Sequence, residues 1–173
     1  MNEFKQLGLF DDCHPTIKPS RQSTKWVLFT DGASRRNPGP AGAGIYIVKD
    51  DEPCVRKGFF LGEKTNNQAE YLALVLGIYY VKKQMSSGDA VYIMSDSELI
   101  IRQMKGEYKV KNKELKKLFD LSKILLEDIQ HSFCHVLREY NVEADELANY
   151  GIDSKTSPPQ AFFSLLQRYS MQI

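Results

Sequence analysis

The sequence predicts an α/β fold in which helices flank a mixed five-stranded sheet, three antiparallel strands followed by two parallel ones. Two observations carry this prediction. Short, turn-rich connections join three apolar, β-rich runs at residues 26–31, 43–50 and 55–62, which is typical of an antiparallel meander. Helical patterns precede two later runs, at residues 90–96 and 132–137, and a strand–helix–strand order favours parallel pairing in one sheet.

The predicted helices have an apolar face or a capping residue. The first spans about residues 65–84 and places apolar side chains at i, i+3 and i+4 spacing: Leu72, Val75, Leu76, Tyr79 and Tyr80. A short helix follows Asp96, and Asn112 caps a longer amphipathic helix. Asn141 begins the last helix of the domain.

We expect three segments along the chain. Residues 1–25 show no sustained periodicity, which predicts a flexible arm. Residues 26–154 hold the strands and helices above and form the domain. Residues 155–173 are a C-terminal extension, in which residues 161–169 can form a short amphipathic helix after a Ser-Pro-Pro break.

Composition restricts the class of protein. The chain has 173 residues, of which 42% are hydrophobic and 26% charged, as in a soluble globular domain. A net charge of +1 creates no global field for nucleic acid, so such contact requires a local patch. No apolar run reaches the roughly 20 residues of a membrane helix, and no signal-peptide pattern is present. Three widely spaced cysteines favour reduced thiols, so we expect a cytoplasmic protein. We also expect a monomer.

Two of the predicted strands, 26–31 and 90–96, end in an aspartate. If they lie side by side and parallel, Asp31 and Asp96 emerge together at one edge of the sheet. Two close carboxylates repel each other, so such a pair implies a shared proton or a bound cation. We favour the cation.

Two further acids complete the candidate site: Glu70, near the start of the first helix, and Asp145, in the last one. Oxygen ligands without a His or Cys cluster favour Mg²⁺, with Mn²⁺ as a possible substitute, over zinc. Four carboxylates suit two ions that clamp the attacking and leaving oxygens of a phosphoryl displacement. Simpler roles stay open, namely Glu70 as the capping-box partner of Asn67 and Asp96 as a helix N-cap.

Four motifs in matching order resemble type 1 ribonuclease H over residues 26–152. They are Thr30-Asp31-Gly32 with Asn37-Pro38-Gly39-Pro40, Thr65-Asn66-Asn67 with Glu70, Ser95-Asp96-Ser97, and Glu143-Ala144-Asp145 with Leu147-Ala148. The resemblance implies a ribonuclease H-like fold and an endonuclease that cuts the RNA strand of an RNA–DNA hybrid, leaving 5′-phosphate and 3′-hydroxyl ends. It also implies that the same four acids are the catalytic residues and the ligands of two Mg²⁺ ions.

The resemblance further implies a set of substrate-binding residues. Telling RNA from DNA requires contact with the 2′-hydroxyl, which donates and accepts hydrogen bonds. Asn37, Asn66 and Asn67 match family positions that make this contact, and Thr65 matches one that binds a DNA-strand phosphate. Asparagine is also common in turns, which is the simpler explanation. Seven basic side chains within residues 102–117 are a candidate surface for the DNA strand or a solvated face.

Two departures from the family pattern affect substrate binding. Glu98 stands where many members have glutamine, and a carboxylate there repels phosphate unless it faces away or pairs with a cation. The loop at residues 137–141 lacks the histidine of some members, as in the short-loop branch without a basic protrusion. Arg138 or Glu139 is then expected to assume part of its role in product departure or metal exchange.

The N-terminal arm contains one compact apolar motif. Gln6-Leu7-Gly8-Leu9-Phe10 resembles the motif by which bacterial proteins bind the replicative sliding clamp, which implies contacts through Gln6, Leu7, Leu9 and Phe10. The alternative is that these side chains pack back on the domain.

Rival functions are a catalytically silent hybrid- or RNA-binding module on the same fold, or a different nuclease such as a resolvase. A silent module has no need of all four acids, and the asparagine set suits ribose sensing. No Ser–His or Cys–His pair supports a covalent route, and no Gly-rich Walker loop supports an NTPase.

Overall fold

A mixed five-stranded sheet forms the centre of residues 23–171, the part of the chain that the computed structural model describes. The strands are β1 (Lys25–Ser34), β2 (Gly39–Lys49), β3 (Glu52–Lys64), β4 (Ala90–Ser95) and β5 (Gln130–His135). The helices are α2 (Asn66–Lys82), α3 (Glu98–Met104), α4 (Lys113–Leu126), α5 (Val142–Ser154) and α6 (Gln160–Arg168), with a 3₁₀ turn at Arg138–Tyr140. The order in the sheet is β3-β2-β1-β4-β5.

Strand pairing confirms the predicted mixed topology. β1 is antiparallel to β2 and β2 to β3, whereas β1 and β4, and β4 and β5, are parallel. The turn between β2 and β3 is Asp50-Asp51, where φ angles of 47° and 71° give the conformation of a two-residue type I′ turn. It therefore begins one residue earlier than the Asp51-Glu52-Pro53 turn that composition indicates.

The first hairpin is longer than predicted. Pairing continues to Ser34 opposite Ala41, through residues that composition assigned to a loop. Glycine and alanine have little strand preference of their own, so hydrogen bonding to the partner strand decides their conformation. β5 likewise begins at Gln130, two residues before the predicted start.

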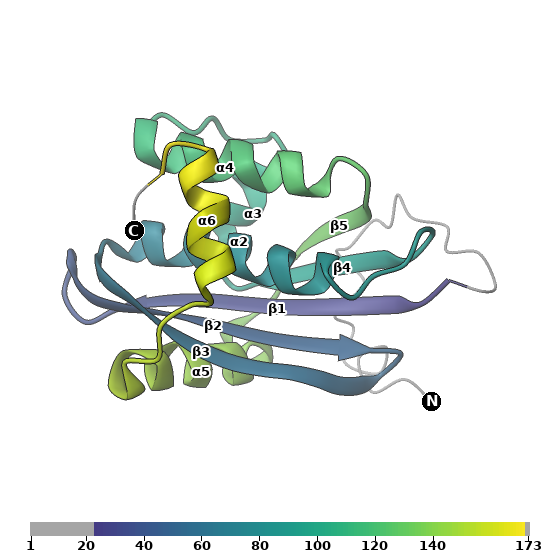
Figure 1. The fold of residues 1–173 in the computed structure, drawn as a ribbon, viewed down its shortest axis with the longest axis horizontal. Coiled ribbons are helices and arrows are strands. Elements are labelled where there is room, and N and C mark those ends of the chain that lie inside the picture. Colours follow the sequence, from purple (N-terminus) through teal and green to yellow (C-terminus); the bar gives the residue numbers. More distant parts are fainter. Residues whose placement is uncertain (1–22, 172–173) are drawn as a thin grey trace.

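Helices cover both faces of the sheet, with α2, α4 and α6 on one side and α5 on the other (Figure 1). Side chains alternate along β1, so Trp26 and Leu28 join the main core beneath α2, whereas Val27 and Phe29 join a smaller cluster with Ala144 of α5. The helices on the two faces of the sheet therefore pack against alternate residues of β1.

α5 packs on β2 and β3 at backbone distance. A Cβ atom on Gly44 would lie 1.9 Å from the carbonyl oxygen of Ala144, and one on Gly58 would lie 2.1 Å from that of Leu147. No larger residue fits at either position without moving the helix. This close approach determines how near Asp145 of α5 stands to the sheet.

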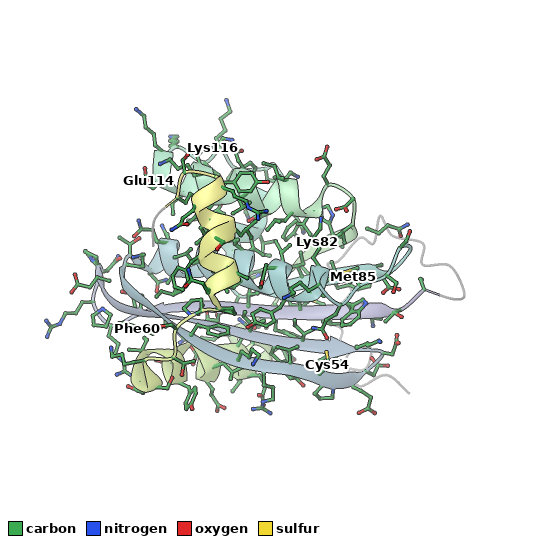
Figure 2. All side chains as sticks on the ribbon, viewed as in Figure 1. Cys54, Phe60, Lys82, Met85, Glu114 and Lys116 are labelled. Atoms are coloured by element: carbon green, nitrogen blue, oxygen red, sulfur yellow. The ribbon has the colours of Figure 1, made fainter. Side chains whose placement is uncertain are left out.

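α6 shares the main core of the domain. Phe162 and Leu166 are buried there, and the ring of Phe162 lies edge-on to Tyr79 at 5.7 Å between centroids. Phe60 lies on β3 (Figure 2), and its backbone N–H donates a 2.7 Å hydrogen bond to the carbonyl of Thr156. The predicted amphipathic helix at residues 161–169 is thus confirmed.

Two expectations about the class of protein can be compared with the structure. Cys54 on β3 is free and exposed (Figure 2), whereas Cys134 of β5 is buried. None of the helices within residues 23–171 has the length and apolar character to cross a membrane.

Candidate active site

Asp31 and Asp96 are brought to the same edge of the sheet. β1 and β4 pair in parallel with Phe29 opposite Met94, and two more residues in that register place Asp31 beside Asp96. Alternation along β1 continues the face of Val27 and Phe29, so Asp31 lies on the side that α5 covers. The crossover through α2 makes these strands parallel, and parallel strands end at a common edge.

Glu70 reaches this edge from α2, which crosses β1 at backbone distance. A Cβ atom on Gly32 would lie 2.1 Å from the backbone nitrogen of Glu70, so only glycine allows the approach. Oε1 of Glu70 accepts a 2.9 Å hydrogen bond from Nδ2 of Asn66. Oε2 of Glu70 is buried and has no hydrogen bond of normal geometry within residues 23–171. The side chain of Ser97 nevertheless lies near enough to the carboxylate to lower the pKa of Glu70.

Asp145 approaches from α5, on the other face of the sheet. Nη2 of Arg138, in the 3₁₀ turn, donates a 2.9 Å hydrogen bond to Oδ1 of Asp145. This bond is the main cause that raises the pKa of Arg138, and the charges of Asp96 and Asp31 add to it. The guanidinium, 79% exposed, therefore faces three of the four acids.

Burial and mutual repulsion raise the pKa of two of the acids. Burial is the main cause for Asp31, whose pKa rises from 3.8 to about 7, and the charges of Asp96 and Asp145 add to it. Burial also raises the pKa of Glu70 from 4.5 to about 7, with contributions from Asp31 and Asp96. Each group is thus only partly ionised near neutral pH unless a cation compensates its charge.

The simpler capping roles of Glu70 and Asp96 are wrong. The hydroxyl of Thr65 accepts a hydrogen bond from the backbone of Gln68 at 3.3 Å, and Oε1 of Gln68 accepts one from the backbone of Thr65 at 2.9 Å. The capping box of α2 therefore consists of Thr65 and Gln68, two residues before the predicted pair of Asn67 and Glu70. α3 has Ser97, not Asp96, at its N-cap.

The donor set fits a hard divalent cation. All four side chains offer carboxylate oxygens, and the buried Oε2 of Glu70 has polar capacity that no neighbour in the described chain satisfies. In the arrangement observed for residues 23–171, no three Asp, Glu, His or Cys side chains converge closely enough to hold one ion. Binding an ion here therefore requires carboxylates to turn toward it.

The predicted ribose-sensing residues lie beside Glu70. Oδ1 of Asn37 accepts a 3.0 Å hydrogen bond from the backbone of Asn66, which itself contacts Glu70, and Asn67 is exposed on the same turn. This network connects the loop after β1 to the start of α2. The hydroxyl of Thr65 is already engaged with Gln68 as a cap.

Glu98 pairs with a cation on its own helix. Its Oε1 lies 2.6 Å from Nη2 of Arg102, one turn later in α3, and the guanidinium of Arg102 stacks on the ring of Tyr108 at 5.2 Å. A carboxylate at this position avoids repelling phosphate if it faces away or pairs with a cation, and in the structure Glu98 pairs with a cation.

The basic stretch of residues 102–117 is partly neutralised. Lys116 pairs with Asp120 and Lys117 with Glu114, and Figure 2 shows Lys116 and Glu114 on α4. Four other lysines have no ion pair within the described chain: Lys105, Lys109, Lys111 and Lys113. These four remain the candidates for contact with a DNA strand.

Sequence reasoning missed two residues of the site. Asn141, assigned only to a helix start, donates from Nδ2 to Oδ1 of Asp96 at 2.7 Å and to the carbonyl of Thr30 at 3.1 Å. The sequence identified Gly32 only as part of the Thr30-Asp31-Gly32 motif. In the structure, Gly32 is the residue of β1 that allows α2 to approach at backbone distance. Neither role has a local signal, because the partners of Asn141 are 45 and 111 residues away.

Arg138→Gln is expected to tighten Mg²⁺ binding by about two- to fivefold, since an exposed ion pair is worth about 1 kcal/mol or less. The guanidinium competes with a cation for Asp145, and glutamine removes the charge while keeping a polar amide on a shorter side chain. Isothermal titration with Mg²⁺ measures the change. Arg35→Gln is the control, because Arg35 pairs with Asp153 at 2.6 Å, eight residues further along α5. Equal affinities in all three proteins would contradict the competition.

The residues predicted to bind a sliding clamp, Gln6, Leu7, Leu9 and Phe10, lie outside the described residues.

Comparison with known proteins identifies the family. A sheet of this order with an acidic edge defines an α/β protein of the ribonuclease H-like fold. A family model described as reverse transcriptase-like matches residues 29–151. The chain is 34% identical to ribonuclease HI of Halobacterium salinarum over 86% of its own length and 74% of that protein. It belongs to the type 1 ribonuclease H-like family.

Two further similarities concern length and structure. A bifunctional protein of Mycobacterium tuberculosis is 37% identical over 75% of the chain, but the chain spans only 36% of that relative. The crystal structure of LC11-RNase H1, isolated from compost by a metagenomic approach, in complex with an RNA/DNA hybrid superposes with a TM-score of 0.70. It is 37% identical and covers 75% of this chain and 97% of its own.

Proposed function

We propose that this protein is an endonuclease that hydrolyses the RNA strand of RNA–DNA hybrids and leaves 5′-phosphate and 3′-hydroxyl ends. The observation that carries the proposal is the edge where β1, α2, α5 and the residue after β4 each contribute one carboxylate, two of them with a pKa raised to about 7. Relatives named ribonuclease H and a relative solved with a hybrid support the substrate class.

We infer that Asp31, Glu70, Asp96 and Asp145 hold two Mg²⁺ ions, for which Mn²⁺ can substitute. When bound, such ions polarise the scissile phosphate and activate the attacking water. Asn66 occupies Oε1 of Glu70 and leaves Oε2 for a cation. Arg138, once released from Asp145, can pair with a phosphate of the substrate or product.

Recognition of ribose is assigned to the surface next to Glu70. The amides of Asn37, Asn66 and Asn67 can donate to and accept from a 2′-hydroxyl, which no deoxyribose carries. We assign Thr65 to a phosphate of the DNA strand. Glu98, neutralised by Arg102, can then lie near the backbone without net repulsion.

The decisive experiment compares a labelled RNA–DNA hybrid with duplex DNA and duplex RNA, in Mg²⁺, Mn²⁺ or chelator. We expect cleavage of the RNA strand of the hybrid alone, and only with metal. A protein that binds the hybrid but never cuts it would instead be a silent binding module. Cleavage that persists in chelator would contradict the metal-dependent mechanism.

We also propose that residues 6–10 dock on a bacterial sliding clamp and that the protein acts as a cytoplasmic monomer. The motif supports docking on a clamp because its apolar side chains stand in a polar segment. In the full-length chain, Leu9→Ala/Phe10→Ala is expected to remove clamp binding in a pull-down and to leave hybrid cleavage intact. Undiminished clamp binding by this variant would reject the docking proposal.

A further inference from the structure

Asn141 connects three of the elements that carry the acids. Its Nδ2 donates both to the carbonyl of Thr30 on β1, at 3.1 Å, and to Oδ1 of Asp96 after β4, at 2.7 Å. Its own carbonyl accepts a 3.1 Å hydrogen bond from the backbone of Asp145 on α5. The side chain of this residue, which is 1% exposed, therefore relates the strand of Asp31 to Asp96, and its backbone begins the helix that carries Asp145.

Asn141 does not cap its helix with its side chain, although capping is the ordinary role of asparagine before a helix. Asn141 is the N-cap of α5, where the side-chain oxygen normally accepts from the first turn, but it makes no side-chain capping bond. Its Oδ1 is instead buried and has no hydrogen-bond partner in the described chain. An unpaired buried acceptor lowers stability, so the inward orientation is not explained by helix formation.

We propose that Asn141 is a positioning residue for Asp96. By occupying Oδ1 of Asp96, its amide fixes the rotation of that carboxylate and leaves Oδ2 for a divalent cation. By contacting Thr30, it fixes the distance of Asp96 from the strand that carries Asp31. Groups that orient the ligands of a metal alter its affinity although they do not touch it. This inference rests on the proposed metal site but not on the nature of the substrate.

Only an amide of this length satisfies both contacts. Alanine removes the donor, and serine retains one donor on a shorter side chain that reaches fewer partners. Asn149 of the same helix is a matched control, because its Nδ2 donates only to the carbonyl of Asp145 within α5, at 3.0 Å. Asn149→Ala therefore removes an amide from α5 without affecting Asp96.

The test measures Mg²⁺ binding by isothermal titration, the rise in melting temperature on adding Mg²⁺, and steady-state cleavage of a hybrid. For Asn141→Ala we expect Mg²⁺ affinity about 10- to 100-fold weaker, a lower kcat and an unchanged KM for the hybrid. Asn141→Ser should be intermediate, and Asn149→Ala should match the wild-type protein.

Two outcomes would overturn the proposal. One is a folded Asn141→Ala protein with wild-type Mg²⁺ affinity, whatever its melting temperature. The other is failure of both Asn141 variants to fold, which would make the residue a purely structural one. If the wild-type protein binds Mg²⁺ but cuts no hybrid, the proposed function fails, whereas the affinities still decide the role of Asn141.

Discussion

Asp31→Asn is expected to abolish hybrid cleavage and, at pH 8 without divalent metal, to raise the melting temperature. Loss of one ligand of the reacting ions should reduce the rate by about 10³-fold or more. The stability gain arises because ionised Asp31 is buried near Asp96 and Asp145, which raises its pKa from 3.8 to about 7. Asparagine has no charge to bury, so the variant avoids this cost. From the size of the pKa shift, we expect its free energy of unfolding at pH 8 to be higher by roughly 2–4 kcal/mol.

The pH dependence has a definite sign. Because the folded protein holds the Asp31 proton more tightly than the unfolded chain does, this group contributes full stability below about pH 4. That contribution is lost as the pH rises through about 7. The advantage of Asp31→Asn should thus be large at pH 8 and vanish near pH 3.5, as thermal melts in chelator at several pH values will reveal.

Asp153→Asn is the matched control. Asp153 pairs with Arg35, and a hydrogen bond from Arg35 is the main cause that lowers its pKa. Its replacement should bring no gain at pH 8 and leave cleavage unchanged. Wild-type cleavage by Asp31→Asn, or a lower melting temperature at pH 8, would refute the assignment of Asp31.

Gly32→Ala is expected to lower both stability and activity. Its Cβ would lie 2.1 Å from the nitrogen of Glu70 and 2.2 Å from the carbonyl carbon of Ala69, and neither backbone atom can move alone. α2 must shift away from β1, which we expect to cost about 3 kcal/mol. The shift also separates Glu70 from Asp31, and a misplacement of about 1 Å can cost about 10²-fold in rate.

Gly88→Ala separates this clash from backbone strain. Gly88 has φ of 92° and no atom within 4 Å of an added Cβ, so alanine there incurs only the cost of the left-handed region, about 1 kcal/mol. Urea unfolding and initial cleavage rates compare the two variants. The packing argument fails if Gly32→Ala is as stable as Gly88→Ala. It also fails if Gly32→Ala cuts the hybrid at the wild-type rate.

Local patterns were sufficient for the framework of the fold. Alternating apolar residues and turn chemistry predicted the β1–β2–β3 meander, and the crossover rule predicted β4 parallel to β1. These features depend on neighbours in sequence, so they can be read without a structure. The exact strand ends could not, because residues such as Ser34 and Ala41 become extended only through pairing with each other.

Capping shows why local patterns also mislead. Thr65, Asn66 and Asn67 are all good N-cap residues, and composition cannot choose among them. The backbone of Thr65 is extended and that of Asn66 is already helical, which makes Thr65 the cap and frees Glu70 from a capping role. The two hydrogen bonds between Thr65 and Gln68 mark where the helix begins.

Strand period, turn chemistry and crossover handedness are local rules, so the order of residues is enough to predict that two strands end in aspartate at a common edge. How those acids are held depends on contacts across the fold: Asn141 points inward onto Asp96, and Arg138 pairs with Asp145. These contacts depend on how closely α2 and α5 approach the sheet. That distance is set by packing between residues far apart in the chain, which no local pattern records.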